Sequence, residues 1–336
     1  MPKVSIIPKA SIIIVNYNGG EWLTRCAAAA SAQTMADFEC FIIDNGSTDG
    51  SIAALPKLDK RFEIIELGEN TGFARANNIG AKRARTPWIA CLNPDAFART
   101  DWLEKLLAET ERGPAVTMVG STQIMALEGD VYDGAGDCYH VSGLAWRSKF
   151  GHKISESATL ETCEIFAPCA AASLYHRETF LRLGGFDERF FCYHEDVDIG
   201  FRMRLDGGIC VQSAAAIVDH VSSGISGRAS DFSVYHGTRN RMWTFMKCMP
   251  ALGLWLFFPA HIVLNLALLC WAMFRPGRFR PTARGVVDGI KGIGPIWKSR
   301  KDIHGARRIG LLGLMKFITI NPVTVLKRRQ HGRPLD

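Results

Sequence analysis

The ten cysteines of this 336-residue sequence include no CxxC pair, and several of them lie inside apolar runs. This spacing disfavours a zinc site or a disulfide framework and favours buried thiols in a reducing compartment. The 32 glycines and 14 prolines follow no period, which excludes collagen-like and low-complexity proteins. No secretory leader is visible, because residues 1–10 contain two prolines and the apolar run Ile12–Val15 is too short. We therefore expect the main body to be cytoplasmic.

The overall composition is that of a globular protein, but the charge is unevenly distributed. Hydrophobic residues make up 47% of the chain and charged residues 22%, which excludes disorder throughout. From Arg275 onward there are fifteen Lys and Arg and three acidic residues, whereas the first 274 residues hold 25 basic and 30 acidic residues. A mildly acidic body with a basic tail argues against nucleic acid as the partner of the main domain. The length suits one large domain with an appendage.

The first hundred residues alternate between short apolar runs and helix-like segments. The runs have the length and β-branched content of strands buried on both faces; they are Ser11–Val15, Phe41–Ile43, Ile64–Leu67 and Trp88–Leu92. Helices are predicted between them at Glu21–Ala32, Ser51–Lys60 and Phe73–Arg85. This order predicts an α/β fold with a mostly parallel central sheet and right-handed crossovers.

A polar cluster follows each of the four apolar runs. The clusters are Asn16–Asn18, Asp44–Ser47, Asn70–Gly72 and Asn93–Asp95. Ligands of open α/β sheets bind at the carboxyl ends of the strands, where all four clusters would lie. Any single cluster is equally well explained as a turn, since Asn, Asp, Gly and Pro are common turn residues. Four of them on one edge favour a binding site.

Residues 110–180 have a weaker pattern. Val116–Gly120 and Ala171–Tyr175 have the composition of strands. Between them, Glu128–Lys153 is rich in glycine and polar residues, and it predicts a loop or hairpin insertion over the site.

A helix is predicted at Glu195–Leu205, with acidic residues at its start and arginines near its end. This charge order complements the helix dipole, and that effect alone would explain it. It does not explain why an aromatic run, Phe190–Tyr193, comes directly before the acids. Aromatic side chains would exclude water around Glu195 and Asp196, and partial desolvation beside a like charge raises the pKa of a carboxyl group and makes it a better base.

Taken together, these motifs resemble the family 2 inverting glycosyltransferases of the GT-A fold, in their rhamnosyltransferase-like branch. The resemblance extends from about Ser11 to Trp243. It rests on IVNYN (14–18), DNGSTDGS (44–51), ENTGFARANN (69–78), LNPDA (92–96), GGFDERFFCYHEDVDIGFR (184–202), DHVSSGISG (219–227) and RNR (239–241).

The resemblance implies roles for individual residues in binding a nucleotide sugar. Asp44 would accept a hydrogen bond from N3–H of a pyrimidine, which uracil and thymine both present. Asn16 and Tyr17 would line the same base pocket, and Arg75 would lie near the ribose and diphosphate. Asp196 corresponds to the catalytic base of the family, and Glu195 beside it to a positioning or acceptor-contacting group.

The resemblance also implies a divalent metal ion, Mg²⁺ or Mn²⁺. Asp95 corresponds to the last acid of the family's DxD motif, and His220 to a further metal or diphosphate contact. The first position of the motif is Asn93, so this chain offers one carboxylate where many relatives have two. A single carboxylate can suffice for an oxygen-ligand site when the diphosphate supplies other ligands.

These roles imply one displacement with inversion at the sugar carbon. The metal neutralises the leaving diphosphate, and a carboxylate on the opposite face takes the proton of the attacking hydroxyl. No second carboxylate stands out as a covalent nucleophile, which disfavours retention. The expected partners are a pyrimidine nucleotide sugar and a glycan or lipid-linked acceptor.

The expected domains are a catalytic domain at residues 1–246 and a membrane-associated helical region at 247–336. Between Lys247 and Arg275 lie 27 residues without a formal charge, enough to cross a bilayer. Pro259 interrupts this stretch, so two shorter interfacial helices or a re-entrant hairpin fit equally well. A helix buried against the catalytic domain is the alternative without a membrane.

Basic residues follow the apolar stretch at once, at Arg275, Arg278, Arg280 and Arg284. Such a cluster is attracted to anionic lipid and is typical of the cytoplasmic side. We therefore expect the protein at the cytoplasmic face of the cell membrane.

Three other functions fit parts of the sequence. A dinucleotide-dependent dehydrogenase would need GxGxxG after the first strand, where the sequence has Asn-Tyr-Asn-Gly-Gly. A sugar nucleotidyltransferase would need a triphosphate loop near the start, which is missing. A non-catalytic nucleotide-sugar-binding protein shares most of the binding residues, and only the Glu195–Asp196 pair argues against it.

Overall fold

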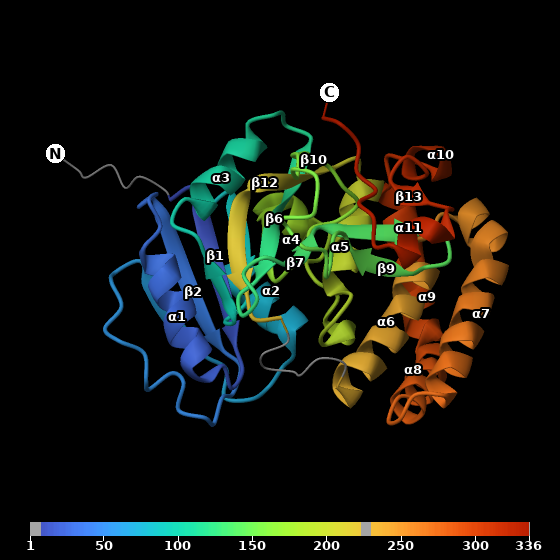
Figure 1. Cartoon of the computed structure of the whole chain (residues 1–336), viewed down its shortest axis with the longest axis horizontal. Coiled ribbons are helices and arrows are strands. Elements are labelled where there is room, and N and C mark those ends of the chain that lie inside the picture. The colour runs from blue at the N-terminus through green and yellow to red at the C-terminus, as the bar shows by residue number, and fades with distance from the viewer. Residues whose placement is uncertain (1–7, 223–229, 336) are drawn as a thin grey trace.

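The computed structural model describes residues 8–222 and 230–335, so part of the 219–227 motif lies outside the described residues. Figure 1 shows a β-sheet with covering helices on one side of the molecule and the helical C-terminal region, in orange and red, on the other. The predicted α/β class is confirmed, and the details of the sheet decide where the polar clusters lie.

The central sheet has ten strands, eight of them in the order β10-β12-β6-β11-β4-β1-β2-β3. These eight are β1 (Ala10–Asn16), β2 (Phe38–Asp44), β3 (Phe62–Glu66), β4 (Trp88–Leu92), β6 (Val116–Met125), β10 (Cys163–Glu164), β11 (Ala172–His176) and β12 (Ile209–His220). The pairings from β4 through β1 and β2 to β3 are parallel, as predicted. β11 runs antiparallel to both β4 and β6, so the sheet as a whole is mixed.

Helices cover both faces of the sheet. α1 (Gly20–Ser31) and α3 (Trp102–Thr110) pack on one face, and α2 (Phe73–Arg83), α4 (Arg177–Arg182) and α5 (Glu195–Leu205) on the other. Successive residues of a strand point to opposite faces, so Ile12 and Ile14 belong to the first core and Ile13 and Val15 to the second.

The helix predicted at Ser51–Lys60 is wrong. Residues 51–54 form a turn and no helix follows. Pro56 explains this difference, because the residue before a proline avoids the helical region of backbone space and proline itself donates no hydrogen bond.

The insertion predicted at Glu128–Lys153 is built from short strands. β7 (Tyr132–Ala135) joins β6 in the central sheet, while β5 (Ala96–Ala98) pairs with β12. β8 (Asp137–His140) and β9 (Ala145–Arg147) form a hairpin, and β13 (Ile318–Thr319) pairs with β8 to complete a second sheet. The C-terminal segment is thereby attached to the insertion.

The remaining helices belong to the C-terminal region. They are α6 (Asp231–Cys248), α7 (Ala251–Met273), α8 (Phe279–Lys291), α9 (Ile293–Ala306), α10 (Leu311–Leu314) and α11 (Pro322–Leu326). α6 packs against both α8 and α9. α7 continues through Pro259 as one helix, so neither two shorter helices nor a re-entrant hairpin is present. Among the described residues it is the one helix long and apolar enough to cross a membrane.

α7 has a polar side that faces the rest of the protein. Nδ1 of His261 lies 2.7 Å from the carbonyl oxygen of Ser142, and Oδ1 of Asn265 accepts a hydrogen bond from Arg241 at 2.7 Å. The opposite side is apolar and exposed, and it comprises Leu252, Trp255, Leu256, Ile262, Val263, Leu266, Trp271 and Met273. We call these eight side chains the outer face of α7.

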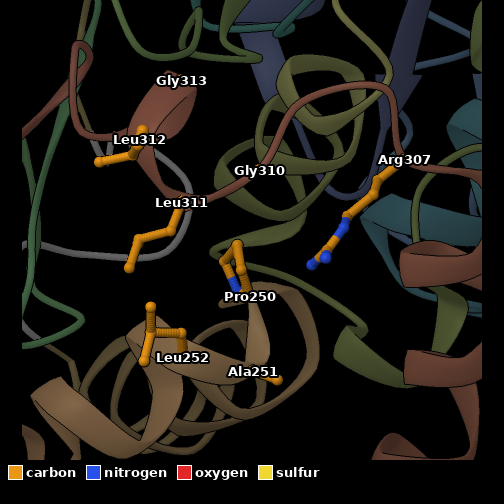
Figure 2. Close-up of a pocket in the computed structure, with 8 residues that line it drawn as sticks. All are labelled: Pro250, Ala251, Leu252, Arg307, Gly310, Leu311, Leu312 and Gly313. Atoms are coloured by element: carbon orange, nitrogen blue, oxygen red, sulfur yellow. The ribbon is translucent and has the colours of Figure 1, made fainter.

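An apolar hollow of about 480 Å³ adjoins the start of α7. Figure 2 shows Leu252 of α7 and Leu311 of α10 on opposite sides of it, with Arg307 extending toward it. Leu252 belongs both to the lining of this hollow and to the outer face of α7.

A buried ion network lies behind α5. The carboxylate of Asp198 is fully buried; it pairs with Arg202 at 2.6 Å and with Nζ of Lys247 at 2.7 Å. Lys247 also pairs with Asp187 at 2.6 Å. The network joins α5 to α6 and so determines where the start of α5 lies.

We expect Asp198→Ala to lower the free energy of unfolding by about 3–5 kcal/mol, because it leaves the buried guanidinium of Arg202 without its carboxylate and Lys247 with Asp187 alone. Urea denaturation of the full chain measures the loss. Asp59→Ala is the matched control: Asp59 pairs with Arg61 at 2.6 Å but is exposed, so its loss should stay below about 1 kcal/mol. Equal losses in the two variants would show that the network does not stabilise the fold.

Candidate active site

The carboxyl ends of β1 and β4 border a cavity of about 530 Å³, which we call the strand-edge cavity. Its lining residues are Val15, Tyr17, Asn45, Asn70, Phe73, Asn93, Pro94, Asp95, Arg147, Phe191, Cys192, Tyr193, His220, Ser230 and Phe232. All four polar clusters predicted from the sequence contribute to it or lie directly beside it. The cavity therefore supports the choice of a binding site over four unrelated turns.

Asn16 and Asp44 are buried at the ends of β1 and β2 and are not among the lining residues. Nδ2 of Asn16 donates to Oδ1 of Asp44 at 3.0 Å and also lies 2.9 Å from the hydroxyls of Ser47 and Ser51. These contacts fix the loop after β2, whose next residue, Asn45, does line the cavity.

Arg75 is exposed on α2 and does not line the strand-edge cavity. It is also absent from the lining of the second cavity, described below, at the start of α5. Asn45 and Asn70 do line the cavity, and Nδ2 of Asn45 donates to Oδ1 of Asn70 at 2.9 Å. The sequence placed both asparagines at the strand edge but did not single them out as site residues.

Asp95 and His220 are brought together by strand pairing. β5 follows Asp95 directly and pairs with the end of β12, where Ala96 lies opposite His220. Nε2 of His220 is 3.2 Å from Oδ1 of Asp95, and Nδ1 is 2.7 Å from Oδ2 of Asp133. Burial alone would lower the pKa of His220, but its hydrogen bonds to Asp133 and Asp95 raise that pKa to about 9. The imidazole is therefore held as a cation between two carboxylates.

The residues of the Asn93–Asp95 cluster fit a hard divalent cation. Oδ1 of Asn93 is buried without a hydrogen-bond partner among the described residues. Asn93 precedes Asp95 by two positions in the sequence. Nε2 of His220 lies beside the carboxylate of Asp95. An amide oxygen, a carboxylate and an imidazole suit Mn²⁺, and the two oxygens alone suit Mg²⁺.

Glu195 and Asp196 line a second cavity of about 330 Å³ at the start of α5, which we call the α5 cavity. The two cavities share five lining residues: Phe73, Asn93, Arg147, Cys192 and Tyr193. Asp95 and Asp196, 101 positions apart in the sequence, therefore lie along one continuous depression.

The surroundings of Asp196 orient its carboxylate and suppress its ionisation. Oδ2 accepts the backbone N–H of Ala170 at 3.1 Å, and Oδ1 accepts that of Val197 at 2.8 Å. Burial nevertheless raises the pKa of Asp196. Burial and the neighbouring charge of Asp196 raise the pKa of Glu195 well above its ordinary value. Burial is the largest cause of the raised pKa of both carboxyl groups. This is the effect expected where an aromatic run excludes water.

The aromatic loop before α5, which includes the short helix η1 (Glu188–Phe190), is held in an uncommon conformation. Phe191, Tyr193 and His194 have φ angles of +66°, +69° and +67°, in the left-handed region. Nδ2 of the buried Asn240 lies 3.0, 2.9 and 2.7 Å from the carbonyl oxygens of Phe190, Cys192 and Tyr193. The RNR motif at 239–241 thus fixes the loop that precedes Glu195, a role that the sequence alone did not suggest.

Comparison with known proteins identifies what this site belongs to. Residues 11–180 match the model of the Glycosyl transferase family 2. The chain belongs to glycosyltransferase family 2.

A rhamnosyltransferase is among the relatives of this family 2 glycosyltransferase. The chain is 30% identical over 248 residues to the N-acetylglucosaminyl-diphospho-decaprenol L-rhamnosyltransferase of Mycobacterium tuberculosis, an alignment that covers 67% of this chain and 80% of that protein. The chain accordingly falls in the rhamnosyltransferase-like branch, as its motifs suggested.

Two solved structures share the fold. GalNAc-T7, solved with UDP, GalNAc and Mn²⁺, has a TM-score of 0.57 at 18% identity, covering 72% of this chain and 48% of that one. A mannosyltransferase of Pyrobaculum calidifontis, solved with GDP-Man and Mn²⁺, has a TM-score of 0.54 at 15% identity. The match covers 90% of this chain and 86% of that one. The fold is of the GT-A type, and the protein is a glycosyltransferase that uses a nucleotide-sugar donor.

The raised pKa of Asp196 predicts how the glycosyltransferase responds to acid. With Asp196 as the proposed general base, which works as the carboxylate, kcat/KM should fall as the pH falls through the raised pKa, with an acid limb centred above the ordinary value of 3.8. Rates measured between pH 4 and 9 give the limb, and circular dichroism at each pH separates it from unfolding. The absence of an acid limb down to pH 4 in folded protein would contradict Asp196 as a base with a raised pKa.

Proposed function

We propose that this glycosyltransferase moves a sugar, L-rhamnose by analogy with its relative, from a pyrimidine nucleoside diphosphate to a hydroxyl of a lipid-linked saccharide, with inversion. The observation that carries the proposal is the sharing of five lining residues by the strand-edge cavity and the α5 cavity. A donor held at Asp95 and an acceptor held at Asp196 would meet where the two cavities join.

Each part of the reaction has a residue to perform it. The attacking hydroxyl gives its proton to Asp196 while its oxygen bonds to the sugar carbon, and the bond from that carbon to the diphosphate breaks. Glu195, with Oε2 buried and lacking a hydrogen-bond partner among the described residues, is suited to orient the acceptor. Asn16 and Asp44 hold the loop after β2 in place, Tyr17 lines the strand-edge cavity, and Asp44 is proposed to contact N3–H of the base.

Asp95, His220 and Oδ1 of Asn93 would hold Mg²⁺ or Mn²⁺. When bound, the ion offsets negative charge on the leaving diphosphate. His220 must give up its Nε2 proton to act as a ligand, so its contribution grows as the pH rises toward its pKa of about 9.

We expect EDTA to weaken donor binding by at least about tenfold and Mn²⁺ to restore it, because Asp95 would hold an ion that offsets the negative charge of the diphosphate. Calorimetry with the donor, with and without metal, measures this change. Asp95→Asn should bind the donor as weakly in Mn²⁺ as the wild type does in EDTA. A wild type whose donor affinity is the same in EDTA would argue against the metal site.

We also propose that residues 247–336 attach the catalytic domain, residues 1–246, to the cytoplasmic face of the membrane. Two observations support this: the outer face of α7 is apolar and exposed, and Arg275, Arg280 and Arg284 are exposed beyond its end. The polar side of α7 is bonded to Ser142 and Arg241, which favours a helix lying in the interface over one that crosses it.

A thermal-shift panel of nucleotide sugars tests the proposed donor. Thymidine- and uridine-diphosphate sugars should raise the melting temperature in Mn²⁺, and guanosine- or adenosine-diphosphate sugars should not. Release of nucleoside diphosphate that depends on a lipid-linked saccharide then tests transfer. Stabilisation by purine nucleotide sugars alone would refute the pyrimidine assignment.

A further inference from the structure

We propose that Arg147 contacts the donor diphosphate and stabilises the charge that develops on it as the sugar leaves. The proposal rests on the nucleotide-sugar transfer described above. In that step the electron pair of the breaking bond from carbon to oxygen stays on the diphosphate, while the proton of the acceptor goes to Asp196. A fixed cation beside the diphosphate would lower the energy of that transition state.

The position of Arg147 supports this role. It is one of the five residues shared by the two cavities, and within the described chain it is the only Lys or Arg that lines either of them. The shared residues mark the junction between the Asp95 end and the Asp196 end of the depression. The bond that breaks would lie at this junction.

The surroundings of Arg147 hold its guanidinium and leave part of the side chain exposed. Oδ2 of the fully buried Asp133 accepts a hydrogen bond from Nη1 of Arg147 at 2.5 Å, and the same oxygen lies 2.7 Å from Nδ1 of His220. Asp133 is thus a positioning residue for two cations. The stem of Arg147 passes over Gly134, where an added Cβ would come within 3.1 Å of its Cδ. About a third of the side chain remains exposed.

The composition of the site indicates why a second cation is useful. A nucleoside diphosphate carries at least two negative charges, and Asn93 replaces an acid, so Asp95 is the one carboxylate of the Asn93–Asp95 cluster. Guanidinium presents several N–H donors in a planar fork that matches phosphate oxygens. Arg75, which the sequence assigned to the diphosphate, lies outside both cavities. A purely structural Arg147, which only offsets the charge of the neighbouring carboxyl groups of Asp133, Asp137 and Asp196, is the alternative.

Binding to the full-length chain in EDTA separates the two roles, because no metal ion then contributes. Calorimetry compares uridine with UDP and thymidine with dTDP for the wild type, Arg147→Gln and Arg147→Lys. Arg83→Gln is the matched control, since Arg83 forms an exposed pair with Glu63 on the outside of α2.

We expect Arg147→Gln to weaken diphosphate binding on the order of 10- to 100-fold and nucleoside binding by less than about twofold. The diphosphate affinity of Arg147→Lys should lie between those of the wild type and Arg147→Gln, and the affinity of Arg83→Gln should match that of the wild type. Unchanged diphosphate binding in Arg147→Gln, or an equal loss for nucleoside and diphosphate, would overturn the proposal and leave a structural role. If Arg147→Gln does not fold, the same comparison is decided by Arg147→Lys. A wild type that binds no pyrimidine nucleoside diphosphate, even in Mn²⁺, would instead refute the proposed function.

Discussion

Asp196→Asn is expected to lower kcat by about 10²–10⁴-fold while leaving donor affinity within about twofold. The substitution removes the proposed proton acceptor and keeps the size of the side chain. Asp196 lines the α5 cavity and not the strand-edge cavity, so the donor should still bind. Steady-state kinetics and donor calorimetry on the same preparation measure the two effects separately.

Glu195→Gln is the matched control for Asp196→Asn, because it changes the adjacent carboxylate by the same chemistry. Its main effect should be a higher KM for the acceptor with a smaller loss of kcat. Both oxygens of Asp196 accept backbone N–H groups, and the amide of asparagine can accept only one of them. The melting temperature of Asp196→Asn must therefore be measured as well. Near-normal turnover of a folded Asp196→Asn protein would show that another group is the base.

Charging the outer face of α7 is expected to weaken binding to anionic vesicles by at least about 100-fold. The variant replaces Leu256, Val263 and Leu266, which are 62%, 64% and 56% exposed, with glutamate. Each of these side chains contributes about 1.5–3 kcal/mol when it enters an apolar phase, and each glutamate is repelled by anionic lipid. Co-sedimentation with phosphatidylglycerol vesicles measures the change.

The control for the α7 variant adds the same charge at exposed alanines. Ala28, Ala53 and Ala54 lie on α1 and the turn after β2, at the end of the molecule opposite α7 (Figure 1). Their replacement by glutamate should leave most of the vesicle binding intact. Truncation after Lys247 is a poorer test, since α6 packs against α8 and α9 and would lose that cover. Equal binding by the α7 variant and the control would exclude the outer face of α7 as the membrane contact.

The features predicted correctly from the sequence are those determined by neighbouring residues. The bounds of α5 follow from its charge order and buried spacing, and the four strands of the first hundred residues follow from short β-branched runs. The helix predicted at Ser51–Lys60 is wrong for a local reason as well, because Pro56 disfavours a helix there.

The features that were missed depend on contacts between distant parts of the chain. Asn240 donates hydrogen bonds to carbonyl oxygens of residues up to fifty positions away in the sequence. Asp133 is hydrogen-bonded to His220, which is 87 positions away. Arg147 lies in an insertion with little sequence pattern, and only the arrangement of β8 and β9 brings it to the junction of the two cavities. No local periodicity encodes such contacts.

The anomeric configuration of the product tests most directly whether Asp95 and Asp196 act from opposite sides of one sugar carbon. Proton NMR of the sugar transferred from a donor of known configuration to a lipid-linked acceptor provides the measurement. Inversion, lost together with turnover in Asp196→Asn, is the expected result. A product with the configuration of the donor would require a covalent intermediate or a different base, and it would contradict the arrangement proposed here.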